Sequence, residues 1–175
     1  YCIPGNAGIA KIATCKNIDI LDNNAILGFC TANKVSFVMI GPEGPLEQGL
    51  VDLLIENEIL VVGPKKKAAM LESSKSFTKM ICGQRNIPTA KYRVAHSESE
   101  ALDYLSEFRH PYVIKEDGLA AGKGVLIAKN KREANEAVRN IFQRSKSDTK
   151  SVIIEEFLKG EEVSVFILTD GVNAI

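Results

Sequence analysis

Residues 112–128 read Tyr-Val-Ile-Lys-Glu-Asp-Gly-Leu-Ala-Ala-Gly-Lys-Gly-Val-Leu-Ile-Ala, and they carry the strongest structural signal in the chain. Two apolar runs bracket a loop, which predicts a hairpin. The loop and the incoming strand together hold three glycines and two lysines, namely Gly118, Gly122, Gly124, Lys115 and Lys123. Glycine lets backbone N–H groups approach a ligand closely, and lysine supplies a countercharge. The stretch therefore predicts a loop that folds over an anion such as phosphate.

The Walker A loop also binds phosphate, but its pattern does not match. It requires four residues between the first glycine and Gly-Lys, followed by Ser or Thr and a helix. Here only residues 119–121 lie between Gly118 and Gly122, Gly124 follows the lysine, and residues 125–128 read as a strand. A strand, a glycine loop and a second strand instead indicate a flap over a nucleotide. The alternative is an ordinary hairpin turn, although a turn requires fewer glycines and lysines.

The amino-acid composition limits the classes of protein to which the chain can belong. The 175 residues are 45% hydrophobic, which is enough for a packed core in one domain or two small ones. Lys plus Arg and Asp plus Glu number 22 each, so no net charge attracts nucleic acid or an anionic membrane. No apolar run approaches the roughly 20 residues of a membrane-spanning helix. We therefore expect neither nucleic acid nor a membrane as a partner.

The cysteines and histidines are not spaced as metal ligands. No Cys-x-x-Cys pair occurs, so we expect neither a zinc site nor a disulfide framework. Free thiols favour a reducing compartment, and we expect the cytoplasm. The residues concerned are Cys2, Cys15, Cys30, Cys82, His96 and His110.

The first third of the chain alternates strands and helices. We expect strands at residues 1–3, 35–40 and 59–62, with residues 35–40 buried. We expect one helix from Asp22 or Asn23 to Asn33, and another that contains Leu46, Leu50, Leu53 and Leu54. This alternation predicts a doubly wound parallel sheet.

Three prolines each follow a predicted strand, and we expect them on one rim of that sheet: Pro4, Pro42 and Pro64. Ligands bind at this rim in α/β sheets, so the loop at residues 4–8 is either a site wall or a tight turn.

The middle of the chain is predicted to be helical. The basic run at residues 65–67 reads as a solvated helix start. A further helix runs from Ser73 or Ser74 to Cys82 and ends at Gly83. Its inward-facing residues are expected to be Phe77, Met80 and Ile81.

The second half predicts an α+β flap. Strands are expected at residues 92–94, 112–115, 125–128 and 151–155. Two helices with capping signals, Ser97 with Glu100 and Asn130 with Glu133, cover one face of the sheet and end at Glu107 and Arg144. Residues 146–150 are expected to be a mobile loop, residues 163–168 a half-buried strand, and Asp170-Gly171 a hairpin turn. The expected parts are an N-terminal domain at residues 1–66, a connecting helix at 67–86, and the flap with the start of a central domain at 87–175.

Five motifs resemble those of the ATP-grasp superfamily and, within it, of the phosphoribosylamine–glycine ligases, also called glycinamide ribonucleotide synthetases. They are PGNAG at residues 4–8, GPE with a following PL at 41–46, LESSKSFTK at 71–79, DGLAAGKG at 117–124 and IEEFLKGEE at 154–162. The resemblance implies a doubly wound α/β domain followed by an α+β ATP-grasp flap, incomplete at both ends. A glycine-rich turn would precede Tyr1, and magnesium ligands would follow Ile175.

The same resemblance implies roles for individual residues. Lys79 and Lys115 would clamp the nucleotide phosphates together with the glycine loop, although Lys79 could be a plain surface lysine. Residues 155–158 would form the hinge beside adenine, and Glu162 would bind the ribose. Nucleotide contacts would thus come from Lys79, Lys115, Gly118, Gly122, Lys123, Gly124, Glu155, Glu156, Leu158 and Glu162, and walls of the phosphoribosylamine site from Gly5, Asn6, Pro42 and Glu43.

For some of these residues a role without function is an alternative. Glu155, Glu156 and Glu161 could each be solvated, and we expect a functional side chain from at most one of them. One common form of the family's loop has alanine where this chain has Glu116. That carboxylate must point away from the phosphates.

The implied reaction joins glycine to 5-phosphoribosylamine. ATP would phosphorylate the glycine carboxylate, with Mg²⁺ or Mn²⁺ as cofactor, and the amine would attack the acyl phosphate. We expect a monomer. The competing hypotheses are another ATP-grasp carboxylate–amine ligase, a biotin-carboxylase-like protein, or a nucleotide-binding fragment that is inactive by itself.

Overall fold

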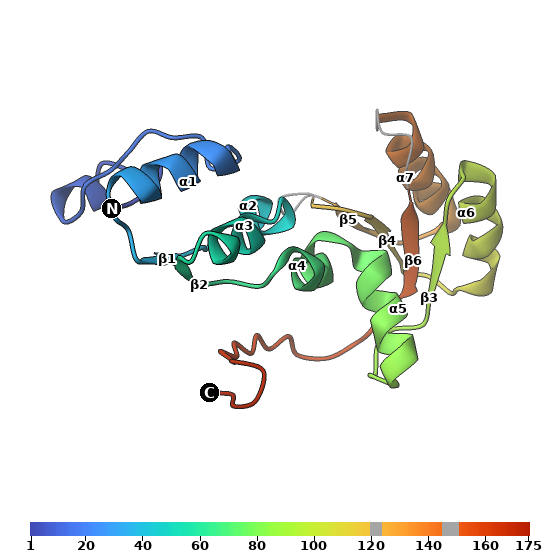
Figure 1. Ribbon diagram of the computed structural model, residues 1–175. Helices are drawn as coiled ribbons and strands as arrows, with labels where there is room; N and C mark the ends of the chain where they lie inside the picture. The colour runs from blue at the N-terminus through green and yellow to red at the C-terminus, as the bar shows by residue number, and fades with distance from the viewer. Residues whose placement is uncertain (120–123, 145–150) are drawn as a thin grey trace.

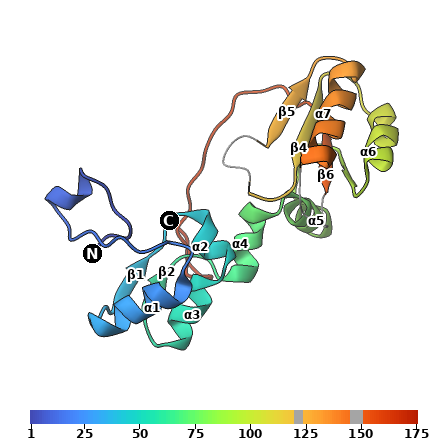
Figure 2. The same cartoon turned by 90° about the horizontal axis from the view of Figure 1, so that it is seen from above.

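The computed structural model describes residues 1–119, 124–144 and 151–175. The expectations for Gly122, Lys123 and residues 146–150 therefore lie outside the described residues. The chain forms two separate sheets with their helices, and the helices α4 and α5 lie between them (Figures 1 and 2).

The first sheet is parallel, as predicted. Strand β1 (Phe37–Met39) pairs with β2 (Leu60–Val62), with Val38 opposite Val61. Helices α1 (Asn23–Ala32) and α3 (Leu50–Glu56) supply most of its core, which consists of Ile26, Cys30, Leu50, Leu54 and Ile59. The predicted cap is confirmed, because the Asp22 carboxylate accepts a hydrogen bond of 2.9 Å from the Ala25 N–H.

This sheet is smaller and more exposed than predicted. Residues 1–3 do not join it, and Cys2 forms only an isolated bridge to Cys15. The expectation of a buried strand at residues 35–40 was wrong for alternate residues. Val38 packs toward the core, whereas Phe37 and Met39 are 51% and 72% exposed. Strand alternation explains the difference, because the core packs against one face only.

The helix predicted around the four leucines is two helices. Helix α2 (Glu43–Glu47) and α3 are separated at Gly49, whose φ of +86° is left-handed. A Cβ at Gly49 would also lie 3.3 Å from Lys66 Cδ. Glycine adopts this conformation without steric cost, so the chain can turn here while Leu46 and Leu54 both stay buried.

Helices α4 (Lys66–Ser73) and α5 (Lys75–Arg85) form the connection. The basic run does begin a helix, and the Ser74 hydroxyl caps α5 by accepting from the Phe77 N–H at 3.2 Å. Two expectations were wrong. Helix α5 continues through Gly83 to Arg85, because one interior glycine costs a helix only about 1 kcal/mol, and Asn86 follows with a φ of +53°. Met80 is 43% exposed.

The second sheet matches the predicted flap. Its strands are β3 (Tyr92–Ala95), β4 (Tyr112–Glu116), β5 (Val125–Ala128) and β6 (Val152–Glu156). Their order is β3-β6-β4-β5 with antiparallel neighbours throughout. Helices α6 (Glu98–Tyr104) and α7 (Lys131–Arg144) cover one face (Figure 1). A 3₁₀ turn η2 (Leu105–Glu107) continues α6, and another, η1 (Ile9–Lys11), lies near the N-terminus.

Both predicted caps of the flap helices are present. The Ser97 hydroxyl accepts from the Glu100 N–H at 3.2 Å, and the Asn130 side chain accepts from the Glu133 N–H at 3.0 Å. These caps fix where α6 and α7 begin, and the apolar faces of both helices pack against the sheet. The other face of the sheet is left for α5 and a cavity.

Residues 157–175 leave the sheet as an exposed segment. The strand expected at residues 163–168 does not form, because no described strand pairs with it, and Val163, Val165 and Phe166 are exposed. The hairpin turn is confirmed, since Thr169 bridges Ala174 and Gly171 has a φ of +94°. Hydrogen bonds from Asn173 and Val172 lower the pKa of Asp170 to about 2. Within the described ranges, no helix is long and apolar enough to cross a membrane.

Candidate functional site

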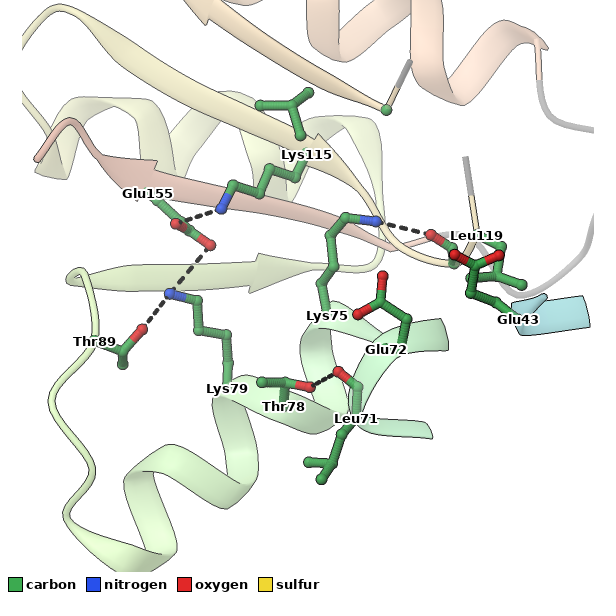
Figure 3. Close-up of a pocket in the computed structure, with 13 residues that line it drawn as sticks. Glu43, Leu71, Glu72, Lys75, Thr78, Lys79, Thr89, Lys115, Leu119 and Glu155 are labelled. Carbon is green, nitrogen blue, oxygen red and sulfur yellow. Dashed lines mark hydrogen bonds and ion pairs between the residues drawn. The ribbon is translucent and has the colours of Figure 1, made fainter. Parts of the chain in front are cut away.

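A cavity of about 670 Å³ lies between the second sheet and helices α4 and α5 (Figure 3). Strand β4 contributes Lys115, β6 contributes Glu155, and α5 contributes Lys75, Thr78 and Lys79. The remaining lining residues are Glu43, Leu71, Glu72, Thr89, Gly118, Leu119, Gly124 and Val125. Both lysines that the sequence singled out therefore face one cavity.

The strand register brings the charged residues together. Val113 pairs with Glu155 across β4 and β6, and Lys115 pairs with Ile153. Side chains two residues apart on a strand share a face, so Lys115 and Glu155 are diagonal neighbours. This face is opposite to the one covered by α6 and α7, where Ile114 and Ile154 are fully buried. Glu116 follows Lys115 in β4, so strand alternation places its side chain on the other face.

Glu155 holds both lysines. It is only 4% exposed, and its Oε2 lies 2.9 Å from the Lys115 Nζ while its Oε1 lies 3.2 Å from the Lys79 Nζ (Figure 3). The contact to Lys79 is an ion pair without well-formed hydrogen-bond geometry, because Oε1 has no such partner among the described residues. Two positive charges thus share one buried negative charge, and the cluster retains a net positive charge that a phosphate would neutralise.

Lys79 is buried rather than a plain surface lysine. It is 7% exposed, donates to the Thr89 hydroxyl at 2.6 Å and lies 5.3 Å from the centre of the Tyr92 ring. From the apolar pattern of α5, the neighbours of Lys79 rather than Lys79 itself were expected to form the inward face of the helix. The sequence misled here because a lysine can occupy a buried position when a carboxylate and a hydroxyl pair with it.

Lys75 was not identified from the sequence as a site residue. It lies one helical turn before Lys79, and its Nζ donates to the Gly118 carbonyl at 2.8 Å. Residues four apart share one face of a helix, so the i, i+4 spacing of the two lysines was an available signal. Among the described residues, three ammonium groups therefore line the cavity, those of Lys75, Lys79 and Lys115.

The glycine loop contributes its described ends to the cavity. Gly118 and Gly124 both line it, and Gly118 has a φ of +98°, which favours glycine. Three of the expected nucleotide contacts are not at the cavity. Glu156 is exposed and accepts from the Lys91 N–H at 2.8 Å, Leu158 is 63% exposed, and Glu162 is exposed.

The four residues expected at the phosphoribosylamine site do not share one described cavity. Glu43 lines the cavity that holds the lysines, and Pro42 lines a separate apolar one of about 420 Å³. Asn6 uses its side-chain oxygen locally, accepting from the N–H groups of Gly8 at 2.9 Å and Ile9 at 3.0 Å. Gly5 has a φ of +78°, and a Cβ there would collide with the Cys15 Sγ.

ATP-grasp proteins join a parallel α/β unit to an antiparallel sheet that has helices on one face and a lysine-lined cavity on the other. The chain has this arrangement and is of that class. Residues 1–72 match the family model for the phosphoribosylglycinamide synthetase N domain. Residues 73–175 match the model for the ATP-grasp (A) domain of the same synthetase. The chain belongs to the phosphoribosylglycinamide synthetase family.

Individual relatives agree with this assignment. The chain is 48% identical to a chloroplastic phosphoribosylamine–glycine ligase of Arabidopsis thaliana and 45% identical to a phosphoribosylamine–glycine ligase of Mesorhizobium japonicum. These alignments cover 99% and 100% of the chain, which spans 34% and 41% of the length of the relatives. A crystal structure of phosphoribosylamine–glycine ligase from Thermotoga maritima superposes with a TM-score of 0.80 at 33% identity, covering 98% of this chain and 41% of that one.

Proposed function

We propose that the protein containing this chain joins glycine to 5-phosphoribosylamine with ATP, giving glycinamide ribonucleotide, ADP and phosphate. Family membership supports the reaction. The observation that carries the nucleotide part is the pairing of Lys79 and Lys115 with one buried carboxylate at the edge of a cavity.

The cavity suits a nucleotide in size and charge. Its volume of about 670 Å³ is within the range of small-molecule sites. Phosphoryl transfer depends mainly on positioning and on cations at the phosphate oxygens, so it requires no protein nucleophile. Lys75, Lys79 and Lys115 would supply positive charge, and the backbone of Gly118 and Gly124 would approach the phosphates. The γ-phosphoryl group would pass to the glycine carboxylate, and the amine of phosphoribosylamine would then displace phosphate from the acyl carbon.

The described residues suit a divalent metal less well than they suit a nucleotide. Within residues 1–119, 124–144 and 151–175, no group of three or more His, Cys, Asp or Glu side chains could hold a metal ion. Mg²⁺ or Mn²⁺ is expected from the family, but we assign no ligand and no step of the reaction to it here.

A second candidate is that this chain alone binds nucleotide without catalysing ligation. The observation that favours it is that the chain spans only 34% and 41% of the two relatives. The family match argues against a different ATP-grasp ligase and against a biotin-carboxylase-like protein. We further propose a monomer in the cytoplasm. The free cysteines support a reducing compartment, although the Arabidopsis relative is named as chloroplastic.

Adenine nucleotides are expected to bind more tightly than guanine nucleotides in the intact protein, because the proposed hinge beside β6 would recognise the adenine edge. ADP should also slow amide exchange at Lys115 and at residues 117–119, because bound phosphate makes local opening of this segment less frequent. Calorimetry with ADP and GDP, together with hydrogen exchange, measures both effects. Helix α7, on the other face of the sheet, is the internal control. Equal affinity for ADP and GDP would contradict the hinge assignment.

Replacing Asn6 with alanine is expected to raise the KM for phosphoribosylamine about 10-fold while leaving the KM for ATP unchanged. The reason is that the Asn6 side chain holds the N–H groups of Gly8 and Ile9, and so sets the shape of the proposed site wall. Steady-state kinetics with each substrate varied in turn provides the measurement. Asn24→Ala, at an exposed position of α1, is the control. If neither KM changed, the loop would be a turn without a substrate role.

A further inference from the structure

Asp117 lies at the root of the glycine loop and bonds to three separate parts of the chain. From the start of α5 its carboxylate accepts hydrogen bonds from the Lys75 N–H at 2.6 Å, from the Ser76 N–H at 3.3 Å and from the Ser76 hydroxyl. The Ser151 hydroxyl, just before β6, donates at 3.0 Å, and the loop's own Gly118 N–H donates at 3.0 Å. One carboxylate thus joins the loop, the helix and the central strand.

The link between the loop and α5 is reciprocal. The Asp117 carboxylate accepts from the backbone of Lys75, and the side chain of Lys75 donates to the backbone of Gly118 at 2.8 Å. Each residue therefore fixes the main chain beside the other. Lys75, Gly118 and the next residue, Leu119, all line the cavity, whereas Asp117 itself does not. Asp117 is placed to set their geometry without occupying the site.

The charge of Asp117 is suited to this role. Burial by itself would raise the pKa of the carboxyl, but hydrogen bonds from Ser76, Ser151 and Gly118 outweigh that effect and lower the pKa. The group is therefore ionised at neutral pH. It also faces the first turn of α5, where the helix dipole favours a negative charge. Asp117 complements the Ser74 cap, because the Ser74 hydroxyl accepts from the Phe77 N–H whereas Asp117 accepts from those of Lys75 and Ser76.

We propose that Asp117 is a positioning residue for the phosphates of the bound nucleotide. It holds Lys75 and the described start of the glycine loop, Gly118 and Leu119, in a fixed relation across the cavity. This inference rests on the proposed nucleotide-binding function. Within the described parts of the chain the hydrogen bonds of Asp117 go to α5, Ser151 and Gly118 and not to residues 155–158, where adenine is proposed to bind, so its effect should be confined to the phosphates.

Replacing Asp117 with asparagine tests the inference in the intact protein. The substitution keeps the size but converts one acceptor oxygen into a donor that faces other donors. We expect ADP to bind about 10-fold or more weakly, since charge-assisted hydrogen bonds of this kind are lost, while adenosine binds as before. Calorimetry with ADP and with adenosine gives the two affinities. Asp103→Asn, at an exposed position of α6, is the matched control and should change neither.

A second variant covers the case in which Asp117→Asn does not fold. Ser76→Ala removes only one of the side-chain donors and should give a smaller loss of ADP affinity, again without affecting adenosine. Where Asp117→Asn does fold, the two losses should not add in the double variant, because both substitutions remove the same contact. Non-additive, ADP-selective losses would support the inference.

The outcomes separate the two proposals. Unaltered ADP binding in both variants, or equal weakening of ADP and adenosine, would overturn the positioning role of Asp117 and leave the proposed function intact. If the unchanged protein bound no ADP, the proposed function would fail, and the role of Asp117 would fail with it.

Discussion

Replacing Glu155 with glutamine is expected to reduce the free energy of unfolding by about 3 to 5 kcal/mol, the usual cost of removing one partner from a buried ion pair. Lys79, at 7% exposed, would lose its only carboxylate partner within the described chain, and Lys115 would lose its own. Chemical denaturation of the intact protein, followed by circular dichroism, measures the loss. Saturating ADP should restore part of it, because phosphate can replace the missing negative charge.

The neighbouring residue provides a matched control. Glu156 follows Glu155 on β6 but points to the other face and is exposed. Its contact is a hydrogen bond from the Lys91 N–H, which a glutamine oxygen can also accept. Glu156→Gln should therefore change stability by no more than about 0.5 kcal/mol. If Glu155→Gln were as stable as this control, the two lysines would not depend on Glu155, and the electrostatic description of the site would be wrong.

Replacing Lys115 with methionine is expected to lower kcat/KM of the intact protein by about 30-fold to several thousand-fold, because one charge-assisted phosphate contact is lost. Methionine keeps the length and the apolar stem of this side chain on β4. Stability should fall less than in Glu155→Gln, because Lys79 still pairs with Glu155. Thermal melting with and without ATP should show a nearly normal melting temperature and a diminished rise on adding ATP.

Lys131→Met, at an exposed position on α7, is the control for removing a lysine charge and should retain full activity. If Lys115→Met also kept full activity, the phosphate contacts would have to come from Lys75 and Lys79. If it failed to fold, Lys115 would be a structural residue and the phosphate role would lose its support.

The flap was the part of the fold best predicted from the sequence. Its caps, such as Ser97 with Glu100, and the apolar spacing of α7 are local signals that no distant contact overrides. The parallel sheet was predicted in type but not in extent, because the exposure of Phe37 and Met39 depends on what covers the sheet. At Gly49 and Gly83 the same residue type had opposite outcomes. Only the positive φ of Gly49 distinguishes them, and φ is not visible in a sequence.

Lys79, Lys115 and Glu155 were all named from the sequence as candidate site residues, but neither the ion pairs among them nor the presence of Lys75 was predicted. Lys79, Lys115 and the ends of the glycine loop were identified from motifs and lie at one cavity. The role of Glu155 as their shared partner depends on the register between β4 and β6, which joins residues far apart in sequence. The contacts of Asp117 with α5 are equally non-local. Sequence patterns describe neighbours along the chain. They could not predict which residues pair across a sheet or between separate elements.

The strand order also bears on how the protein acquires this site during folding. Strand β6 is the last of the four in sequence, yet it lies between β3 and β4. The β4–β5 hairpin can form soon after it leaves the ribosome, whereas β3 has no partner until β6 inserts beside it. Such long-range pairing raises the contact order and slows folding. Because Glu155 arrives on that final strand, completion of the sheet and pairing of Lys79 and Lys115 with their shared carboxylate are expected to occur in a single cooperative step.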